Sequence, residues 1–175
     1  MDRLIIEGFI GSGKGAVAKS VAKQLGLARI DVDQKVAEKL KMSSGEIYDR
    51  FGEAYYRAME TVVLDELKSL DSRAVIILGS GVAMMPQNAP YLKELGRVYY
   101  IKMKQGTLLE RMRDDKRHAW IRGEHWEDQV VRLYKEREPA YRKVANVVID
   151  AEGKTVDQIA DEITADAFRT EHDED

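Results

Sequence analysis

Short apolar runs alternate along this chain with segments whose apolar residues recur at helical spacing. Continuous apolar residues at 4–6, 74–78 and 98–101 are typical of strands covered on both faces. We predict strands over residues 3–7, 28–31, 74–78, 97–102 and 146–149. We predict helices over residues 14–25, 33–40, 44–50, 53–70, 88–95, 105–114, 124–136, 138–144 and 155–168, with a capping box at residues 43–46.

Alternating strands and helices of this kind predict an α/β fold, in which a parallel sheet is covered by helices on both sides. In such sheets ligands bind beyond the carboxyl ends of the strands. The candidate residues below all fall at those ends or in loops above them.

The first predicted strand leads into Gly8-Phe9-Ile10-Gly11-Ser12-Gly13-Lys14-Gly15, which reads as a phosphate-binding loop, G-x-x-x-x-G-K-[ST], with Gly15 in place of the last Ser or Thr. Backbone N–H groups and the following helix N-terminus would bind phosphate, and Lys14 would contact the outer phosphates. A Gly-rich turn that arose by chance is the alternative. The hydroxyl missing at Gly15 normally holds Mg²⁺, although water or another side chain can complete such a site.

Composition narrows the class of protein. The 175 residues suit one domain, which we place at 1–168, with an acidic tail at 169–175. A net charge of −3 argues against a general nucleic-acid binder, and the lack of cysteine excludes disulfides and thiol chemistry. No apolar run is long enough for a membrane span. We expect a cytoplasmic monomer that binds no membrane.

Carboxylates and glycines follow the next two strands. Asp31 and Asp33 would both face the phosphate-binding loop, one near Mg²⁺ and the other accepting a hydrogen bond or proton from a substrate hydroxyl. The alternative for Asp33 is a helix N-cap. Gly79-Ser80-Gly81 would let the backbone approach a ligand closely, or form an ordinary loop.

Three arginine-containing segments are candidates for binding anions. Arg57 and Glu60 stand three apart on a helix, which by itself favours a solvated ion pair over a substrate clamp. Arg137 precedes Pro139, and it either caps carbonyls or faces the site. A basic run would form a solvated face or a lid over phosphates at about 111–124. It comprises Arg111, Arg113, Lys116, Arg117 and Arg122.

Two tryptophans and two histidines lie in or beside this basic run. We interpret His118 and His125 as surface residues because they have no metal-ligand spacing, while Trp120 and Trp126 have no assigned role.

Taken together, these segments resemble the shikimate kinase family over residues 4–163. That family reads G-x-x-G-x-G-K-[ST], then D-x-D, which here is Asp31-Val32-Asp33. Its F-R-x-x-E is matched by Tyr56-Arg57-Ala58-Met59-Glu60, and its G-G-G by Gly79-Ser80-Gly81. The lid motif R-P-L-L is matched only at the first residue of Arg117-His118-Ala119-Trp120. R-x-P-x-Y is intact as Arg137-Glu138-Pro139-Ala140-Tyr141.

The resemblance implies a three-layer α/β/α fold of the P-loop NTPase type, similar to nucleoside monophosphate kinases, with a five-stranded parallel sheet. It implies phosphorylation of shikimate by ATP with Mg²⁺. Lys14, Asp33 and Arg117 would be catalytic, and Asp31 would lie near the metal. Nucleotide would contact Gly11, Ser12, Gly13, Lys14, Gly15, Ala16, Arg111 and Arg117. Shikimate would contact Asp33, Arg57, Glu60, Gly79, Ser80, Gly81 and Arg137.

Departures from the family pattern at Gly15, Ser80 and residues 118–120 keep two alternatives open. One is a diverged kinase for another small hydroxy acid. The other is a non-catalytic protein that only binds nucleotide.

Overall fold

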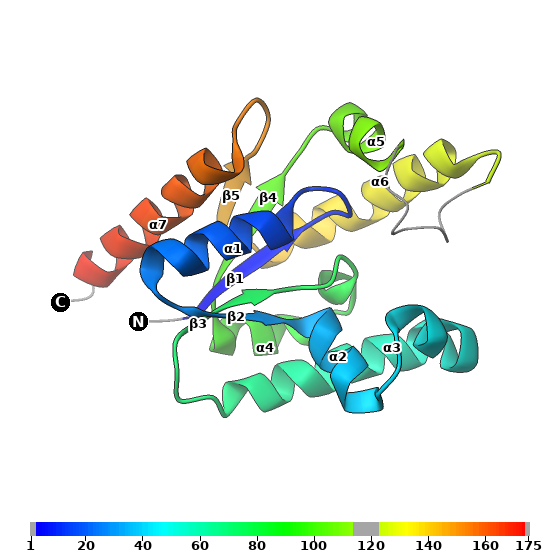
Figure 1. Ribbon diagram of the computed structural model, residues 1–175, viewed down its shortest axis with the longest axis horizontal. Helices are drawn as coiled ribbons and strands as arrows, with labels where there is room; N and C mark the ends of the chain where they lie inside the picture. Colours follow the sequence, from blue (N-terminus) through cyan, green and yellow to red (C-terminus); the bar gives the residue numbers. More distant parts are fainter. Residues whose placement is uncertain (1–2, 114–122, 174–175) are drawn as a thin grey trace.

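The computed structural model describes residues 3–113 and 123–173 and contains a five-stranded parallel sheet (Figure 1). The strand order is β2-β3-β1-β4-β5. Every predicted strand is confirmed to within one residue at each end. The strands are β1 (Arg3–Gly8), β2 (Ala28–Asp31), β3 (Ala74–Ile77), β4 (Gly96–Lys102) and β5 (Val147–Asp150).

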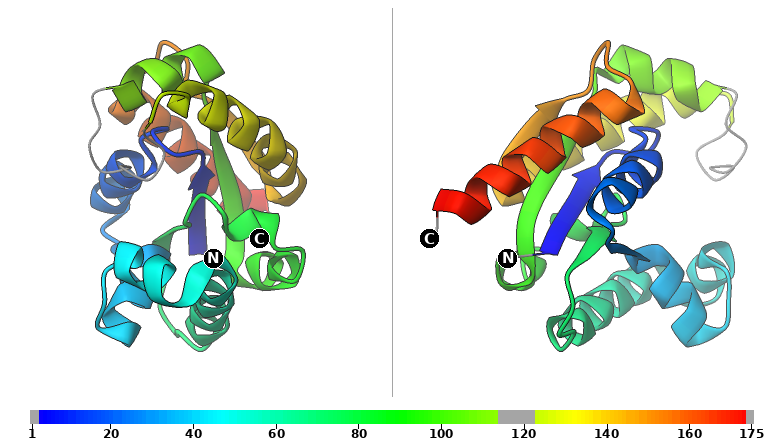
Figure 2. Two further views of the ribbon diagram at one scale, coloured as in Figure 1. Left: turned by 90° about the vertical axis from the view of Figure 1, so that its right-hand side faces the viewer. Right: turned by 60° about the vertical axis from the view of Figure 1, so that its left-hand side comes forward.

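Helices cover both faces of this sheet, as the alternating pattern predicts. Figure 1 shows α1 and α7 together, and Figure 2 shows α6 on the opposite side of the sheet from α1, with α4 beneath α6. The helices are α1 (Lys14–Leu25), α2 (Val32–Leu40), α3 (Ser44–Lys68), α4 (Asn88–Leu95), α5 (Gln105–Arg113), α6 (Trp126–Val144) and α7 (Val156–Asp173), with a short 3₁₀ turn η1 (Val82–Met84).

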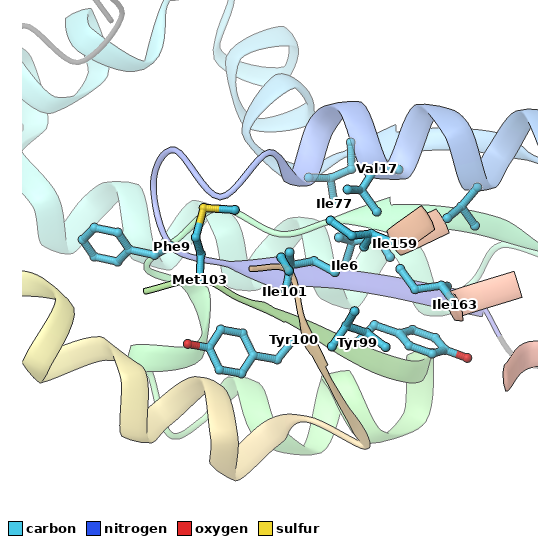
Figure 3. Close-up of a cluster of buried hydrophobic side chains, with 14 of the residues drawn as sticks. Ile6, Phe9, Val17, Ile77, Tyr99, Tyr100, Ile101, Met103, Ile159 and Ile163 are labelled. Atoms are coloured by element: carbon cyan, nitrogen blue, oxygen red, sulfur yellow. The ribbon is translucent and has the colours of Figure 1, made fainter. Parts of the chain in front are cut away.

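Alternation along the strands divides the core into two layers. Ile6, Ile77 and Ile101 pack in one cluster with Val17 of α1 and Ile163 of α7 (Figure 3). The intervening strand residues pack on the opposite face with α3 and α4. They are Ile5, Ile76 and Val98. Each such fully buried aliphatic side chain contributes about 1.5–3 kcal/mol, so the two layers fix the strand register.

At two places where we predict a break between helices, the structure has one helix. Residues 44–50 and 53–70, predicted as separate helices, form α3 with a kink at Gly52, whose φ of 81° is a conformation that favours glycine. Residues 124–136 and 138–144 were also predicted separately, but α6 runs through Pro139. Arg137 and Tyr141, on either side of the proline, both bind Ser80, so this part of α6 is held against the loop after β3.

The remaining differences concern helix ends. α2 begins at Val32, one residue earlier than predicted, because Asp31 is its N-cap and accepts a hydrogen bond from the backbone N–H of Gln34. α7 extends to Asp173, so most of the segment expected as an acidic tail is helical. The turn η1 has no counterpart among the predicted elements. Within the described ranges, no helix is long and apolar enough to cross a membrane.

Candidate active site

The loop between β1 and α1 has the backbone of a phosphate-binding turn. Gly11 and Gly13 adopt φ of 80° and 85°, and the backbone N–H of Ser12 bonds to the carbonyl of Phe9 at 3.1 Å. Gly13 is the N-cap of α1 and has no side chain to satisfy the first N–H groups of the helix. These N–H groups therefore remain available to an anion, whose charge the helix dipole also favours.

Lys14 and Arg111 bring positive charge to this loop. Lys14 Nζ donates to the carbonyl of Gly8 at 2.9 Å, and burial lowers its pKa while the charge of Asp33 opposes that effect. Arg111 Nη1 lies 3.4 Å from the carbonyl oxygen of Gly11, to which it donates. The structure thus brings together the residues predicted to bind nucleotide from 11 to 16 and places Arg111 beside them.

The residues around Gly15 fit a magnesium ion held mainly through water and phosphate oxygens. Among the described residues, a Cβ built on Gly15 would meet no atom within 4 Å, so the place of the missing hydroxyl is open space. Asp31 supplies the nearby carboxylate: its Oδ1 accepts from the Gln34 N–H at 3.2 Å, and burial raises its pKa. Within residues 3–113 and 123–173, no group of three or more His, Cys, Asp or Glu is placed to hold a metal. One carboxylate plus water and phosphates is a common environment for Mg²⁺.

Arg57 and Glu60 form a buried pair, and their interpretation from spacing alone as a solvated pair is wrong. Arg57 is 8% exposed and Glu60 is fully buried, with 2.6 Å between Arg57 Nη1 and Glu60 Oε2. Arg57 Nη2 also donates to Tyr48 Oη at 2.7 Å. Burial raises the pKa of Glu60 to about 7, with Arg57 opposing and Asp33 reinforcing the shift. The guanidinium is therefore fixed in orientation before any ligand binds.

The glycines after β3 allow these side chains to approach the sheet edge. A Cβ on Gly79 would lie 2.7 Å from Asp33 Oδ1 and from Glu60 Oε1. A Cβ on Gly81 would overlap the guanidinium of Arg57. A side chain at either position would displace these charged groups, so the two glycines let Asp33, Glu60 and Arg57 pack directly over the loop.

Arg137 and Tyr141 of α6 close the other side of this loop. Arg137 is 6% exposed, and its Nη1 donates to Ser80 Oγ at 2.7 Å. Tyr141 Oη donates to the Ser80 carbonyl at 2.5 Å. Arg137 therefore faces Ser80 and the site, and the alternative in which it caps helix carbonyls is wrong.

Asp31, and not Asp33, is the N-cap of α2. The carboxylate of Asp33 is therefore free for a role at the site. Asp33 lies in the first turn of α2, and its Oδ1 accepts a hydrogen bond from Tyr56 Oη at 2.6 Å. Its charge also interacts with that of Lys14. The predicted phosphate-binding and acceptor-binding residues therefore meet at this one carboxylate.

Glu7 belongs to this region, although it was not among the predicted site residues. It is fully buried at the end of β1, and neither carboxyl oxygen has a hydrogen-bond partner among the described residues. Burial raises its pKa to about 8, and the charges of Lys14, Glu60 and Arg137 act on it. A charged residue inside an apolar strand, one position before the Gly-rich loop, was the available signal.

Part of the predicted basic lid is described, and part is not. Arg111 and Arg113 end α5, and Arg113 pairs with Glu127 at 3.4 Å. Arg117, His118 and Trp120 lie outside the described residues. His125 is exposed, as expected.

Trp126, which had no assigned role, is half-buried at the first turn of α6. It packs against the larger core cluster.

Comparison with known proteins identifies the family. Residues 10–167 match the family model for shikimate kinase. The shikimate kinase of Thermodesulfovibrio yellowstonii is 32% identical over 163 residues, 93% of each chain. A solved shikimate kinase from Acinetobacter baumannii, in complex with shikimate, superposes with a TM-score of 0.89 at 29% identity, covering 97% of this chain and 94% of that one. The enzyme from Aquifex aeolicus gives a TM-score of 0.81 at 28% identity over 94% of this chain and 95% of its own. The chain belongs to the shikimate kinase family.

Proposed function

We propose that this protein transfers the γ-phosphate of ATP to a hydroxyl of shikimate and yields ADP and shikimate 3-phosphate. The observation that carries the proposal is the meeting of two anion sites at Asp33. The phosphate-binding loop with Lys14 lies on one side, and the Arg57–Glu60 pair lies on the other. Membership of the shikimate kinase family, and likeness to a relative solved with shikimate, support this acceptor.

The nucleotide half of the site follows from the P-loop. The backbone N–H groups of residues 11–16 would bind the phosphates, Lys14 would leave the Gly8 carbonyl to contact the outer ones, and Arg111 would lie beside the nucleotide. Asp31, through water, would hold Mg²⁺ together with the phosphate oxygens. The bound ion would neutralise charge that develops on the transferring group.

The acceptor half of the site is built to bind a carboxylate and a hydroxyl. Arg57 and Arg137 supply two buried guanidinium groups, whose planar forks suit a carboxylate. Glu60 orients Arg57 and Ser80 orients Arg137, so little side-chain entropy remains to be lost on binding. The loop of Gly79 and Gly81 would bring backbone next to the acceptor.

The transfer step needs few protein groups. The acceptor hydroxyl oxygen forms a bond to the γ-phosphorus while the bond from that phosphorus to the bridging oxygen of ADP breaks. Asp33 orients the acceptor hydroxyl, takes its proton as the new bond forms, and releases that proton to solvent after the product leaves. Lys14 stabilises the negative charge on the phosphoryl oxygens during transfer. A contribution from Arg117 of the lid to the same charge remains a prediction.

A coupled assay for ADP release tests this function. Purified protein with ATP and Mg²⁺ is expected to release ADP rapidly only when shikimate is added. Release that depends on another small hydroxy acid and not on shikimate would identify a diverged kinase. ATP binding, seen as a ligand-dependent rise in melting temperature, without turnover on any acid would indicate a non-catalytic nucleotide-binding protein.

A further inference from the structure

The hydroxyl of Tyr56 belongs to a hydrogen-bonded chain that ends on the proposed catalytic carboxylate. Tyr56 Oη lies 2.6 Å from Asp33 Oδ1 and 3.2 Å from Ser44 Oγ. A phenol has only one hydrogen to donate, and Asp33 as a carboxylate can only accept. The Tyr56 proton therefore points to Asp33, and Ser44 donates to the Tyr56 oxygen. The order of donation is Ser44 to Tyr56 to Asp33.

Tyr56 remains a donor throughout the working pH range. Burial raises the pKa of its hydroxyl, and the charge of Asp33 raises it further. An O–H to carboxylate distance of 2.6 Å is within the range of charge-assisted hydrogen bonds, which are about twice as strong as neutral ones. Among the described residues, the second oxygen of Asp33, Oδ2, accepts no hydrogen bond and is free for an acceptor hydroxyl.

The kink in α3 creates this arrangement. Ser44 and Tyr56 are twelve positions apart and would be separated by about 18 Å along a straight helix. The non-helical backbone at Gly52 turns the first part of α3 back, so that Ser44 reaches the Tyr56 hydroxyl. Tyr56 itself is 2% exposed, and its ring packs on Tyr48 with 4.6 Å between centroids. The hydroxyl thus has little freedom to point elsewhere.

The family pattern F-R-x-x-E has phenylalanine where this chain has Tyr56, so the contact to Asp33 is an addition to that pattern. We propose that Tyr56 is a positioning residue, which occupies Asp33 Oδ1 and thereby directs Oδ2 at the acceptor hydroxyl. The proposal rests on the function proposed above, because it assumes that Asp33 binds the hydroxyl to be phosphorylated.

Without the hydrogen bond from Tyr56, two charged side chains would determine the orientation of the Asp33 carboxylate. The charge of Lys14 attracts it, and Glu60 Oε1 lies near it across Gly79 and repels it. Reorientation of the carboxylate toward Lys14 would weaken the contact to the acceptor hydroxyl and also occupy the lysine needed at the phosphates. Tyr56 therefore prevents a resting ion pair that would block both roles.

Steady-state kinetics of Tyr56→Phe test the proposal. The variant is expected to lower kcat about tenfold, as for loss of one hydrogen bond to a charged group, with the KM for ATP unchanged within about twofold. Ser44→Ala should give a smaller loss of about twofold, since it removes only the outer bond of the chain.

Tyr55→Phe is the matched control. It makes the same chemical change one position away, on a ring that is 38% exposed and packs on Phe51 outside the site. It should match the parent in kcat and in the KM for ATP. Circular dichroism of each variant establishes that it is folded before the rates are compared.

Two results would overturn the proposal. One is a Tyr56→Phe enzyme with an unchanged kcat. The other is a crystal structure of Tyr56→Phe in which Asp33 keeps the parent rotamer. The second readout needs no turnover, so it separates this inference from the proposed function. Absence of shikimate-dependent ADP release in the parent protein would refute only the latter.

Discussion

Replacing Glu7 with glutamine should make the stability of the protein less sensitive to pH between 5 and 8. The change keeps the shape of a side chain that is fully buried at the end of β1 and removes its ability to ionise. Because neither carboxyl oxygen has a hydrogen-bond partner among the described residues, the substitution breaks no described hydrogen bond. The pH dependence of the difference between the two proteins therefore reports on the ionisation of Glu7.

The magnitude follows from the proton affinity of this carboxyl. Burial raises the pKa of Glu7 from its ordinary 4.5 to about 8, although Lys14 opposes the shift. Between these two values the unfolded chain has lost the proton and the folded protein keeps it, so stability falls by about 1.4 kcal/mol per pH unit. The stability contributed by protonated Glu7 is complete below pH 4.5 and is lost as the pH rises through about 8. The full loss amounts to roughly 4–5 kcal/mol.

The assay is urea denaturation followed by circular dichroism at pH 5, 6, 7 and 8. Glu7→Gln should gain stability relative to the parent at each step, up to roughly 4 kcal/mol over the whole range. Glu38→Gln is the control, because Glu38 is exposed and its contacts with Gln34 and Lys35 lower its pKa. The difference in free energy of unfolding between Glu38→Gln and the parent should not change with pH over the same range.

If the stability difference between Glu7→Gln and the parent is also independent of pH, the claim that folded Glu7 keeps its proton is refuted. It would mean that Glu7 is already ionised in the folded protein, with Lys14 or Arg137 compensating its charge. The charge of an ionised Glu7 would raise the pKa of Lys14 against the effect of burial, so the measurement also bears on the lysine of the nucleotide site.

Three further substitutions test separate parts of the site. Gly15→Ser restores the hydroxyl in a position with open space around it and should lower the Mg²⁺ concentration needed for half-maximal activity; an unchanged Mg²⁺ titration would show that Gly15 does not limit metal binding. Arg57→Ala leaves Glu60 and the substrate carboxylate unpaired, at a cost of roughly 2–5 kcal/mol, and should raise the KM for shikimate at least about 30-fold. An unaltered KM would contradict the binding of the substrate carboxylate by Arg57. Gly81→Ala places a methyl group on the guanidinium of Arg57 and should likewise raise that KM, whereas wild-type kinetics would show that the loop and Arg57 move apart easily.

The strands and the phosphate-binding loop were predictable from sequence because their signals are local. Apolar runs marked β1, β3 and β4, and glycines at positions 11 and 13 marked the turn that requires positive φ. Which aspartate caps α2 was not predictable. Aspartate is a good N-cap residue at both 31 and 33, and the answer depends on the exact residue at which the helix begins.

The Arg57–Glu60 pair shows why burial was harder to predict. Its spacing is that of a surface pair, and only the packing of α3 against Gly79 and Gly81, some twenty residues later in the chain, buries it. Pro139 likewise favours a helix break locally, whereas α6 continues through it and its neighbours Arg137 and Tyr141 bind Ser80, about sixty residues earlier in the chain. Tertiary contacts of this kind have no local sequence signal.

Phosphorus NMR of the complete reaction tests the central claim most directly, because it identifies where the phosphoryl group goes. With the protein, ATP, Mg²⁺ and shikimate, we predict that the ATP signals give way to those of ADP and of a new phosphomonoester, and that mass spectrometry of the product gives the mass of shikimate phosphate. Formation of inorganic phosphate alone, or an ATP spectrum that does not change while shikimate is present, would contradict it.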